Sequence, residues 1–224
     1  MDLYLISGLG ADERIFRELT FPADHYVHYI KWLEPLSPKE SLDAYCRRLC
    51  EQIDQTKTFI LIGLSFGGMV ACALNTIVKP CKTILISSVA VRAELPLVYK
   101  LAGSLGIIRL LPSKPPPGLM KVLEWFMGVE TPADRALVRQ FIRCSVPGFN
   151  KWAMSEAANW RRTEPPDNMY QLHGAADRIF PVSINNAGYI IRGGGHFMVL
   201  NRPEKVSRIL SDILTTSEGN HSKV

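Results

Sequence analysis

The sequence lacks the long apolar segments that mark membrane-spanning and secreted proteins. No apolar run approaches the length of about 18 residues that a transmembrane helix requires. The chain enters an apolar stretch directly after Met1-Asp2, without the basic region of a signal peptide. We therefore expect a cytoplasmic protein without a membrane partner.

A disulfide framework is also missing. The five cysteines are an odd number without regular short spacing, which is typical of a reducing compartment. Cys46 and Cys50 are four residues apart on an expected helix and would supply half of a metal site. No third ligand lies close to them in the sequence, so we interpret both as buried or half-buried thiols.

Charge of one sign is not concentrated in a stripe. The formal net charge of +5 comes from scattered Lys and Arg residues, and Arg47-Arg48 and Arg161-Arg162 are isolated pairs. Aromatic residues do not alternate with the basic ones, so we expect no nucleic-acid partner. The chain has no internal repeat, and its 224 residues, 47% of them hydrophobic, suit one globular domain.

What the sequence does contain is an alternation of strand-like and helix-like segments. Several expected strands are apolar throughout, as strands buried on both faces of a parallel sheet should be. The expected strands cover residues 3–7, 26–32, 59–64, 83–87, 169–172 and 189–192, and expected helices begin near Ser41, Gly67 and Pro203. This order predicts an α/β fold with a doubly wound, mostly parallel sheet.

The segment from about 91 to 162 breaks this alternation. It offers no good strand, and its helix-compatible stretches surround a loop that contains three consecutive prolines. We therefore expect an inserted helical unit. Its many aromatic residues either form a core of their own or contribute to a lid over a site.

The stretch GLSFGG, residues 63–68, lies where the expected strand 59–64 meets a helix. A serine between glycines marks either a plain tight turn or a nucleophile elbow, in which the turn is too sharp for side chains at the neighbouring positions. Open α/β sheets place their ligand sites at the carboxyl ends of central strands. This position favours the elbow, with Ser65 as a nucleophile.

A serine nucleophile needs a base, and the base needs an orienting carboxylate. Asp177 follows the expected strand 169–172, and His196 follows the expected strand 189–192. Asp134 and Asp167 are alternatives for the acid. We interpret His173 as structural, because it lies too close to its strand to swing towards the serine.

Four stretches carry a family resemblance: SGLGAD, GLSFGG, HGAADRIFP and GGGHF, in this order over nearly the whole chain outside the helical unit. With them the chain resembles the α/β-hydrolase fold superfamily, in particular a small serine esterase or lipase with a helical cap. The resemblance implies that Ser65 is the nucleophile, His196 the general base and Asp177 the orienting acid. It also implies that the backbone N–H groups of Leu9 and Phe66 form an oxyanion hole.

The resemblance further implies one α/β-hydrolase domain over residues 1–224, with the cap at about 91–162. Two features depart from the family pattern. Ser7-Gly8 stands where many relatives have His-Gly, and the chain begins at the family's third strand, with a short connection between Asp177 and His196. We therefore expect a trimmed sheet of about six strands, with the helix before the last strand reduced or missing.

The implied reaction is hydrolysis of small, apolar ester-type substrates through an acyl-enzyme, with no metal or organic cofactor. Alternatives are a thioesterase, lactonase or carbon–carbon bond hydrolase of the same fold, and a small-molecule receptor or scaffold with little turnover. The oligomeric state is not indicated. We expect the substrate pocket to be lined by Trp125, Phe126, Phe149, Trp152 and Met198.

Overall fold

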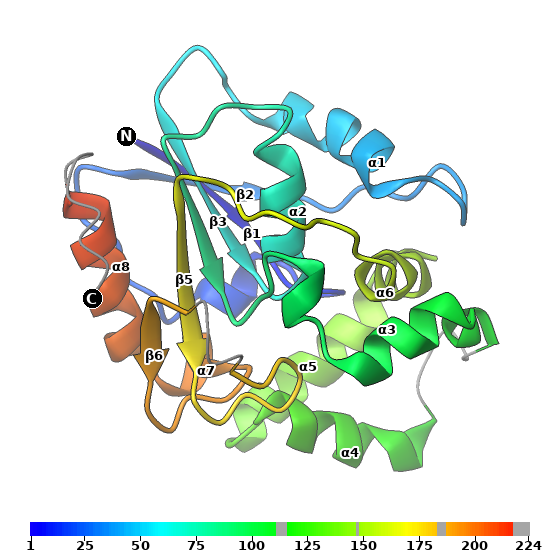
Figure 1. Cartoon of the computed structure of the whole chain (residues 1–224). Coiled ribbons are helices and arrows are strands. Elements are labelled where there is room, and N and C mark those ends of the chain that lie inside the picture. The colour runs from blue at the N-terminus through cyan, green and yellow to red at the C-terminus, as the bar shows by residue number, and fades with distance from the viewer. Residues whose placement is uncertain (111–115, 147, 183–186, 217–224) are drawn as a thin grey trace.

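The structure, a computed structural model, describes residues 1–110, 116–146, 148–182 and 187–216. Its centre is a sheet of six strands in the order β2-β1-β3-β4-β5-β6, and every neighbouring pair is parallel (Figure 1). The strands are β1 (Asp2–Ile6), β2 (Tyr26–Ile30), β3 (Phe59–Leu64), β4 (Lys82–Ile86), β5 (Met169–Gly174) and β6 (Tyr189–Ile191). The expected α/β fold with about six strands is confirmed.

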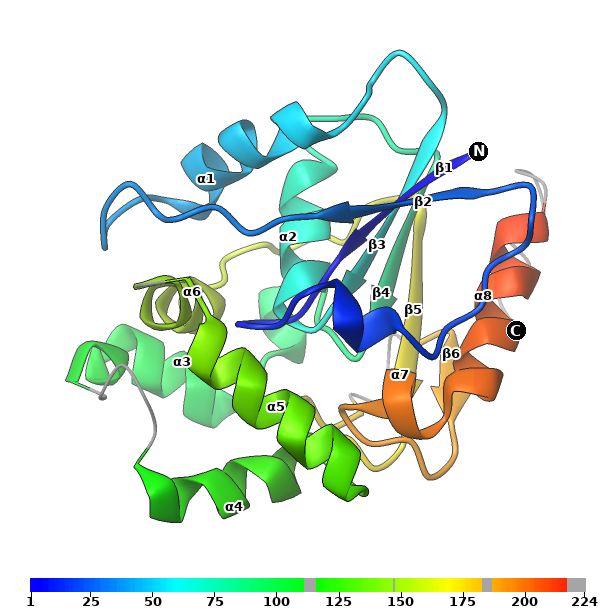
Figure 2. The same cartoon turned by 180° about the vertical axis from the view of Figure 1, so that it is seen from behind.

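Helices cover both faces of this sheet. Figures 1 and 2 show α1 (Leu42–Leu49) and α2 (Phe66–Leu74) on one side and α8 (Pro203–Thr215) on the other. Successive side chains of a strand point to opposite faces. In β3, Leu61 therefore packs with the first pair of helices, whereas Ile60 and Ile62 pack in a second cluster with α8. Burial on both faces explains why these strands are apolar throughout.

The helices begin where the sequence supplies a suitable residue. Ser41 caps α1, because its hydroxyl accepts a hydrogen bond from Ala44 N at 3.2 Å. Pro203 opens α8 at a position where the missing N–H has no intrahelical partner. α2 ends at Leu74.

Between β4 and β5, the residues that the structure describes form helices and no strand. The helices are α3 (Leu97–Ser104), α4 (Pro117–Met127), α5 (Pro132–Cys144) and α6 (Phe149–Ala158), with short 3-10 turns η3 (Arg92–Glu94) and η4 (Ile107–Leu110). We call residues 97–158 the α3–α6 segment. In Figure 1 its helices α3, α4 and α5 lie beyond the carboxyl ends of the strands. The indole N–H of Trp152 ties α6 to the loop before α1 through Glu40 O (2.8 Å). After the segment, the indole N–H of Trp160 donates to Ala90 O (3.1 Å).

The connection between β5 and β6 has no helix among its described residues, in line with the expected trimming. The polypeptide then passes through the short α7 (Met198–Asn201) into α8. Over the parts of the chain that the structure describes, no helix is both long and apolar enough to cross a bilayer.

Candidate active site

Ser65 occupies the sharp turn between β3 and α2. Its backbone has φ 53° and ψ −122°, a conformation that non-glycine residues rarely adopt and that stores about 1–3 kcal/mol of strain. A Cβ at Gly63 would collide with the backbone of Gly67, and a Cβ at Gly67 would collide with the carbonyls of Ile6 and Ser7. The glycines around the serine are therefore required by the close approach of α2 to the strand ends.

The structure brings Ser65, His196 and Asp177 into one chain of hydrogen bonds. His196 Nε2 lies 2.8 Å from Ser65 Oγ, and His196 Nδ1 lies 2.9 Å from Asp177 Oδ2. With a proton on Nδ1, the imidazole donates to the carboxylate and accepts from the serine hydroxyl. This is the geometry in which a histidine can take the serine proton.

Asp177 is fully buried and held by several donors. Its Oδ1 accepts from the backbone N–H groups of Ile179 (2.8 Å) and Phe180 (2.9 Å). Burial by itself raises the pKa of a carboxyl group, but the charge of His196, together with hydrogen bonds from His173, His196 and Phe180, outweighs it and holds the pKa of Asp177 well below its usual range. Asp177 is therefore a carboxylate at neutral pH.

His173 supports this loop rather than the serine. Its Nε2 donates to Phe180 O at 2.6 Å and lies 3.4 Å from Asp177 Oδ2. Burial lowers the pKa of His173, but the neighbouring Asp177 carboxylate outweighs burial, so the net pKa is raised. The position fits the structural interpretation made from the sequence.

Neither alternative acid lies in this arrangement. Asp134, on α5, bonds to the hydroxyl of Thr131 at 2.7 Å and faces Arg17 at 3.7 Å. Asp167 is exposed and precedes β5, so it lies at the opposite end of the strand from Asp177.

The loop after β1 approaches Ser65 from the other side. Gly8 lies directly beside the serine, since a Cβ built there would be 3.5 Å from Ser65 Cβ. Ser7 Oγ donates to Ala11 O at 2.8 Å and so closes the loop on itself. The N–H of Phe66, as the first residue of α2, has no intrahelical acceptor, and the N–H of Leu9 belongs to the loop at the same cavity.

A cavity of about 460 Å³ opens beside Ser65. Its walls come from the β1 and β3 ends, from the loops that carry Asp177 and His196, and from helices of the α3–α6 segment. Among the described residues that line it, the polar side chains are those of Ser65, His196 and Tyr99. The apolar lining includes Leu9, Met69, Val98, Ala102, Ile108, Met127, Val138, Phe141, Ile142, Met154, Ala157, Ile179, Phe180 and Phe197.

The five side chains expected to line this pocket do not line it, so that prediction is wrong. Phe149 and Trp152 pack into the core beside α1 and α2, where the Trp152 ring lies 4.4 Å from that of Tyr45, centroid to centroid. Met198 is fully buried in the core cluster of α8. Trp125 and Phe126 lie on the outer side of α4, 56% and 37% exposed.

The physical reason is helix and turn geometry. Successive residues of a helix point about 100° apart. Met127 therefore faces the cavity, while Trp125 and Phe126, the two residues before it on α4, face solvent. Phe197, one position before Met198, is the residue of that turn that lines the cavity. The spacing of Val138, Phe141 and Ile142 on α5 marks an apolar face in the sequence, but periodicity does not tell a cavity wall from a core.

The C-terminal end of α4 is tied to the loops of the candidate triad. The last carbonyls of a helix have no intrahelical partner, and here groups from the sheet side satisfy them. The bonds run from Arg178 Nη1 to Trp125 O (2.7 Å), from Phe197 N to Met127 O (3.1 Å) and from Asn201 Nδ2 to Gly128 O (2.8 Å). Arg178 and Phe197 directly follow Asp177 and His196.

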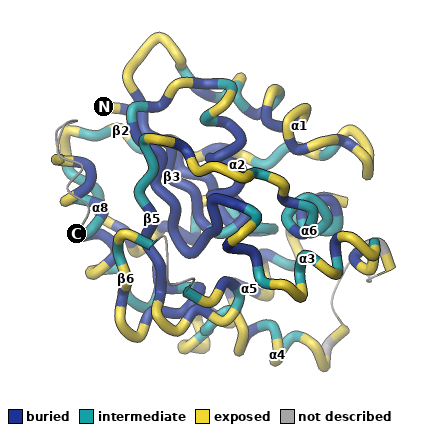
Figure 3. Tube along the Cα trace, in the orientation of Figure 1, coloured by how far each residue is buried: buried dark blue, intermediate teal, exposed yellow. Residues whose placement is uncertain are grey.

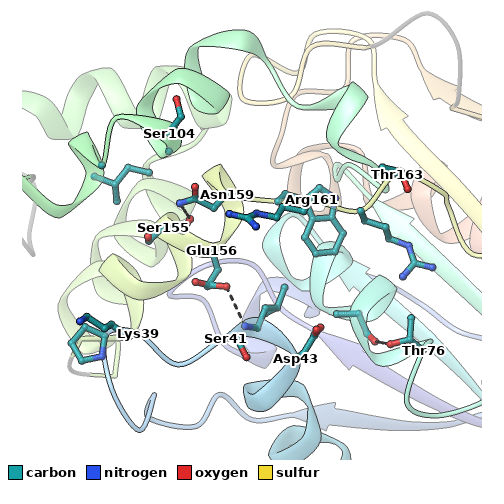
Figure 4. Close-up of a pocket in the computed structure, with 18 of the residues that line it drawn as sticks. Lys39, Ser41, Asp43, Thr76, Ser104, Ser155, Glu156, Asn159, Arg161 and Thr163 are labelled. Atoms are coloured by element: carbon teal, nitrogen blue, oxygen red, sulfur yellow. Dashed lines mark hydrogen bonds between the residues drawn. The ribbon is translucent and has the colours of Figure 1, made fainter.

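A larger and more open depression of about 1110 Å³ lies elsewhere, between α1, α3 and α6 (Figure 4). The described residues that line it include Lys39, Asp43, Glu156 and Arg161 and none of the three groups above. Glu156 there accepts the N–H of Leu42 at 3.1 Å, at the start of α1. We therefore place the candidate site at the smaller, apolar cavity beside Ser65.

Within the described residues, no group of three or more His, Cys, Asp or Glu side chains is arranged to hold a metal ion. Cys46 is buried and Cys50 is half-buried, and both are free thiols.

The parallel strand order, the strained serine between β3 and α2, and the acid and histidine on the following strand ends define an α/β-hydrolase fold. A family model described as "Alpha/beta hydrolase family" matches residues 3–209. The chain belongs to this family. No sequence among the curated proteins matches it significantly.

Solved structures of hydrolases share the fold at low sequence identity. A thermophilic esterase from Thermogutta terrifontis superposes with a TM-score of 0.71 at 17% identity, over 96% of this chain and 89% of that one. A putative lipase from Acinetobacter baumannii gives 0.67 at 19%, over 96% and 85%. A meta-cleavage product hydrolase from Pseudomonas fluorescens gives 0.66 at 16%, over 96% and 90%. At these identities the likeness concerns the fold.

Proposed function

We propose that the protein is a serine hydrolase that cleaves small, apolar carboxylic ester-type substrates through an acyl-enzyme. The observation that carries this proposal is the hydrogen-bonded set Ser65–His196–Asp177 at the wall of an apolar cavity. A site that only binds a ligand has no need of a carboxylate that orients a histidine towards a serine.

In the proposed mechanism His196 Nε2 takes the Ser65 proton as Oγ attacks the substrate carbonyl. Asp177 fixes the imidazole and stabilises its charged form. The N–H groups of Leu9 and Phe66 bind the oxyanion, and His196 then protonates the leaving group. A water molecule, activated by the same histidine, hydrolyses the acyl-enzyme and restores Ser65. None of these steps requires a metal or organic cofactor.

The cavity supports a preference for apolar chains of limited length. Each CH₂ buried there contributes about 0.8 kcal/mol, or roughly fourfold in binding. We expect kcat/KM on p-nitrophenyl esters to rise from acetate to about butyrate or hexanoate and then to fall as the cavity of about 460 Å³ is filled.

We further propose that the chain forms one domain, with the α3–α6 segment as the cap of the site. The support is that α3, α5 and α6 all contribute side chains to the cavity walls beside Ser65.

The type of bond that the enzyme cleaves is a separate question. The structural neighbours include an esterase, a lipase and a meta-cleavage product hydrolase, and the same serine chemistry serves thioesters and lactones as well. A competitive activity profile over esters, thioesters, lactones and carbon–carbon substrates assigns it.

The test of the proposal is labelling by a fluorophosphonate probe together with turnover of p-nitrophenyl butyrate. We expect Ser65→Ala to abolish labelling and to lower kcat by about 10⁵-fold or more. The matched control, Ser104→Ala at an exposed serine of α3, should leave both unchanged. Stoichiometric ligand binding without turnover in the parent protein would favour the receptor alternative instead.

A further inference from the structure

Most of the large hydrophobic side chains that the protein leaves exposed lie on α3, η4 and α4. Single exposed hydrophobic residues are normal, but ten of them within residues 97–126 indicate an interaction surface. Figure 3 shows exposed positions along α3 and α4. We call this set of residues the apolar rim; it consists of Leu97, Val98, Leu101, Leu105, Ile107, Leu110, Leu119, Val122, Trp125 and Phe126. The remaining exposed large hydrophobic residues of the described chain lie outside these helices: Met1, Tyr26, Tyr29, Leu36 and Ile190.

Helical spacing gives α3 two apolar faces. Leu97 and Leu101 follow each other at four-residue spacing on the exposed side, and Leu101 is 51% exposed. On the other side, Tyr99 and Ala102 line the cavity at Ser65. A helix that is apolar on two faces is expected to have a partner on both. On its inner side α3 packs against α6, where Gly103 lies against Ala158. On its solvent side, no described residue covers the exposed leucines.

The charges around the apolar rim are positive. Residues 95–123 contain no Asp or Glu, while Lys100 and Lys121 lie on α3 and α4. Arg178 adds a guanidinium 4.1 Å above the ring of Trp125. The carboxylate of α4 itself, Glu124, is buried and paired with arginines of α5.

We propose that the apolar rim docks on an anionic phospholipid surface. Apolar side chains enter the boundary between head groups and acyl chains, a tryptophan settles at that depth, and lysines bind the anionic head groups. A second copy of the chain is the poorer occupant, because pairing two rims would bring like charges together. The proposal revises the sequence-based expectation of no membrane partner, and it concerns surface association, not a spanning helix.

The rim adjoins the entrance of the cavity. Val98 is 65% exposed and also lines the cavity beside Ser65. An apolar molecule held in the lipid surface could therefore reach the serine without crossing water. Binding to the surface does not depend on catalysis, so this proposal stands or falls separately from the proposed hydrolase activity.

The test is flotation of the purified full chain with vesicles. We expect binding to vesicles of phosphatidylglycerol and phosphatidylcholine in equal parts, weaker binding to phosphatidylcholine alone, and a decrease with salt. Of the three tryptophans other than Trp125, Trp152 and Trp160 are buried, and Trp32 is partly buried against the core. A blue shift of tryptophan emission on vesicle binding should therefore come mainly from Trp125 and disappear in Trp125→Phe, while binding persists.

Charge variants locate the surface. Leu101→Asp and Val122→Asp should each weaken vesicle binding by about tenfold or more. Leu36→Asp, at a residue that is 75% exposed in the loop before α1 and outside the rim, is the matched control and should bind like the parent. Lys121→Glu should weaken binding more than Lys205→Glu on α8. All five variants should hydrolyse a water-soluble ester at the parent rate, which confirms that they are folded.

Three results would overturn the proposal. The first is equal or absent binding of the parent to both kinds of vesicle. The second is a loss of binding in Leu36→Asp as large as that in Leu101→Asp. The third is a parent dimer in light scattering that Leu101→Asp converts to a monomer while vesicle binding is absent, which would assign the rim to a second copy.

Discussion

The sheet core and the α3–α6 segment use apolar residues in different ways. Every residue of β1 and β3 is buried, because helices cover both faces of the sheet. In α3, by contrast, Gly103 is the only residue that is buried. Close packing of this core holds the strand ends, and the loops that follow them, in place around Ser65 and His196. The segment also buries side chains of α5 and α6, but α3 and the outer side of α4 have few packing constraints. Their side chains are therefore free to set specificity.

The largest expected effect comes from comparing a carboxylate on a loop of the sheet core with a carboxylate of the α3–α6 segment. We expect Asp177→Asn to lower kcat by about 10⁴-fold, because the amide cannot hold the imidazole in the tautomer that accepts the serine proton. Asp134→Asn on α5 should leave kcat on p-nitrophenyl butyrate near that of the parent. Parent-like activity of Asp177→Asn would remove that residue from the proposed triad.

The next test adds one methyl group to a glycine in each region. Gly67→Ala should destabilise the fold by about 1–3 kcal/mol, since its Cβ would collide with the carbonyls of Ile6 and Ser7. Gly118→Ala in α4 has open space around the new Cβ and should stabilise the helix by about 0.5–1 kcal/mol. Urea denaturation measures both. Equal effects would mean that the two regions are packed alike.

A smaller effect is expected on specificity. Ala102 lines the cavity, so Ala102→Leu should fill part of it and shorten the preferred acyl chain by about two or three carbons, at roughly fourfold per CH₂. Ala136→Leu, on the exposed side of α5, is the control and should keep the parent profile. A shift in neither variant would place the acyl chain outside this cavity.

The smallest effect concerns the hydroxyl of Tyr99. It is the polar side chain that the α3–α6 segment contributes to the cavity, and its ring contacts that of Phe180 at 6.2 Å between centroids. We expect it to hydrogen-bond an acceptor in the substrate, at about 0.5–1.5 kcal/mol. The ratio of kcat/KM for p-nitrophenyl methoxyacetate over the isosteric butyrate should then fall two- to tenfold in Tyr99→Phe. An unchanged ratio would mean that the Tyr99 hydroxyl does not contribute to substrate binding.

The difference between the two regions also explains which predictions from the sequence held. Strands such as Phe59–Leu64 were predictable because burial on both faces demands an unbroken apolar run, and GLSFGG because a tight strand-to-helix turn demands glycines at fixed positions. Trp152 shows the limit. Its spacing marks an apolar helix face. Whether that face packs against α1 or lines the cavity depends on the orientation of α6. The hydrogen bond from the Trp152 indole to Glu40 O is part of the packing that fixes this orientation.

The sequence by itself determined the parallel sheet, the elbow and the three polar residues at its strand ends. Local backbone sterics and hydrophobic periodicity are properties of short stretches of sequence, so they can be read without the structure. The carboxyl ends of parallel strands meet at one edge of the sheet, which brings the three residues together. Only the tertiary structure decided which side chains line the cavity, and that Trp125 and Phe126 face solvent. Those facts depend on the relative placement of helices distant in sequence, which arises from many weak contacts and leaves no local pattern.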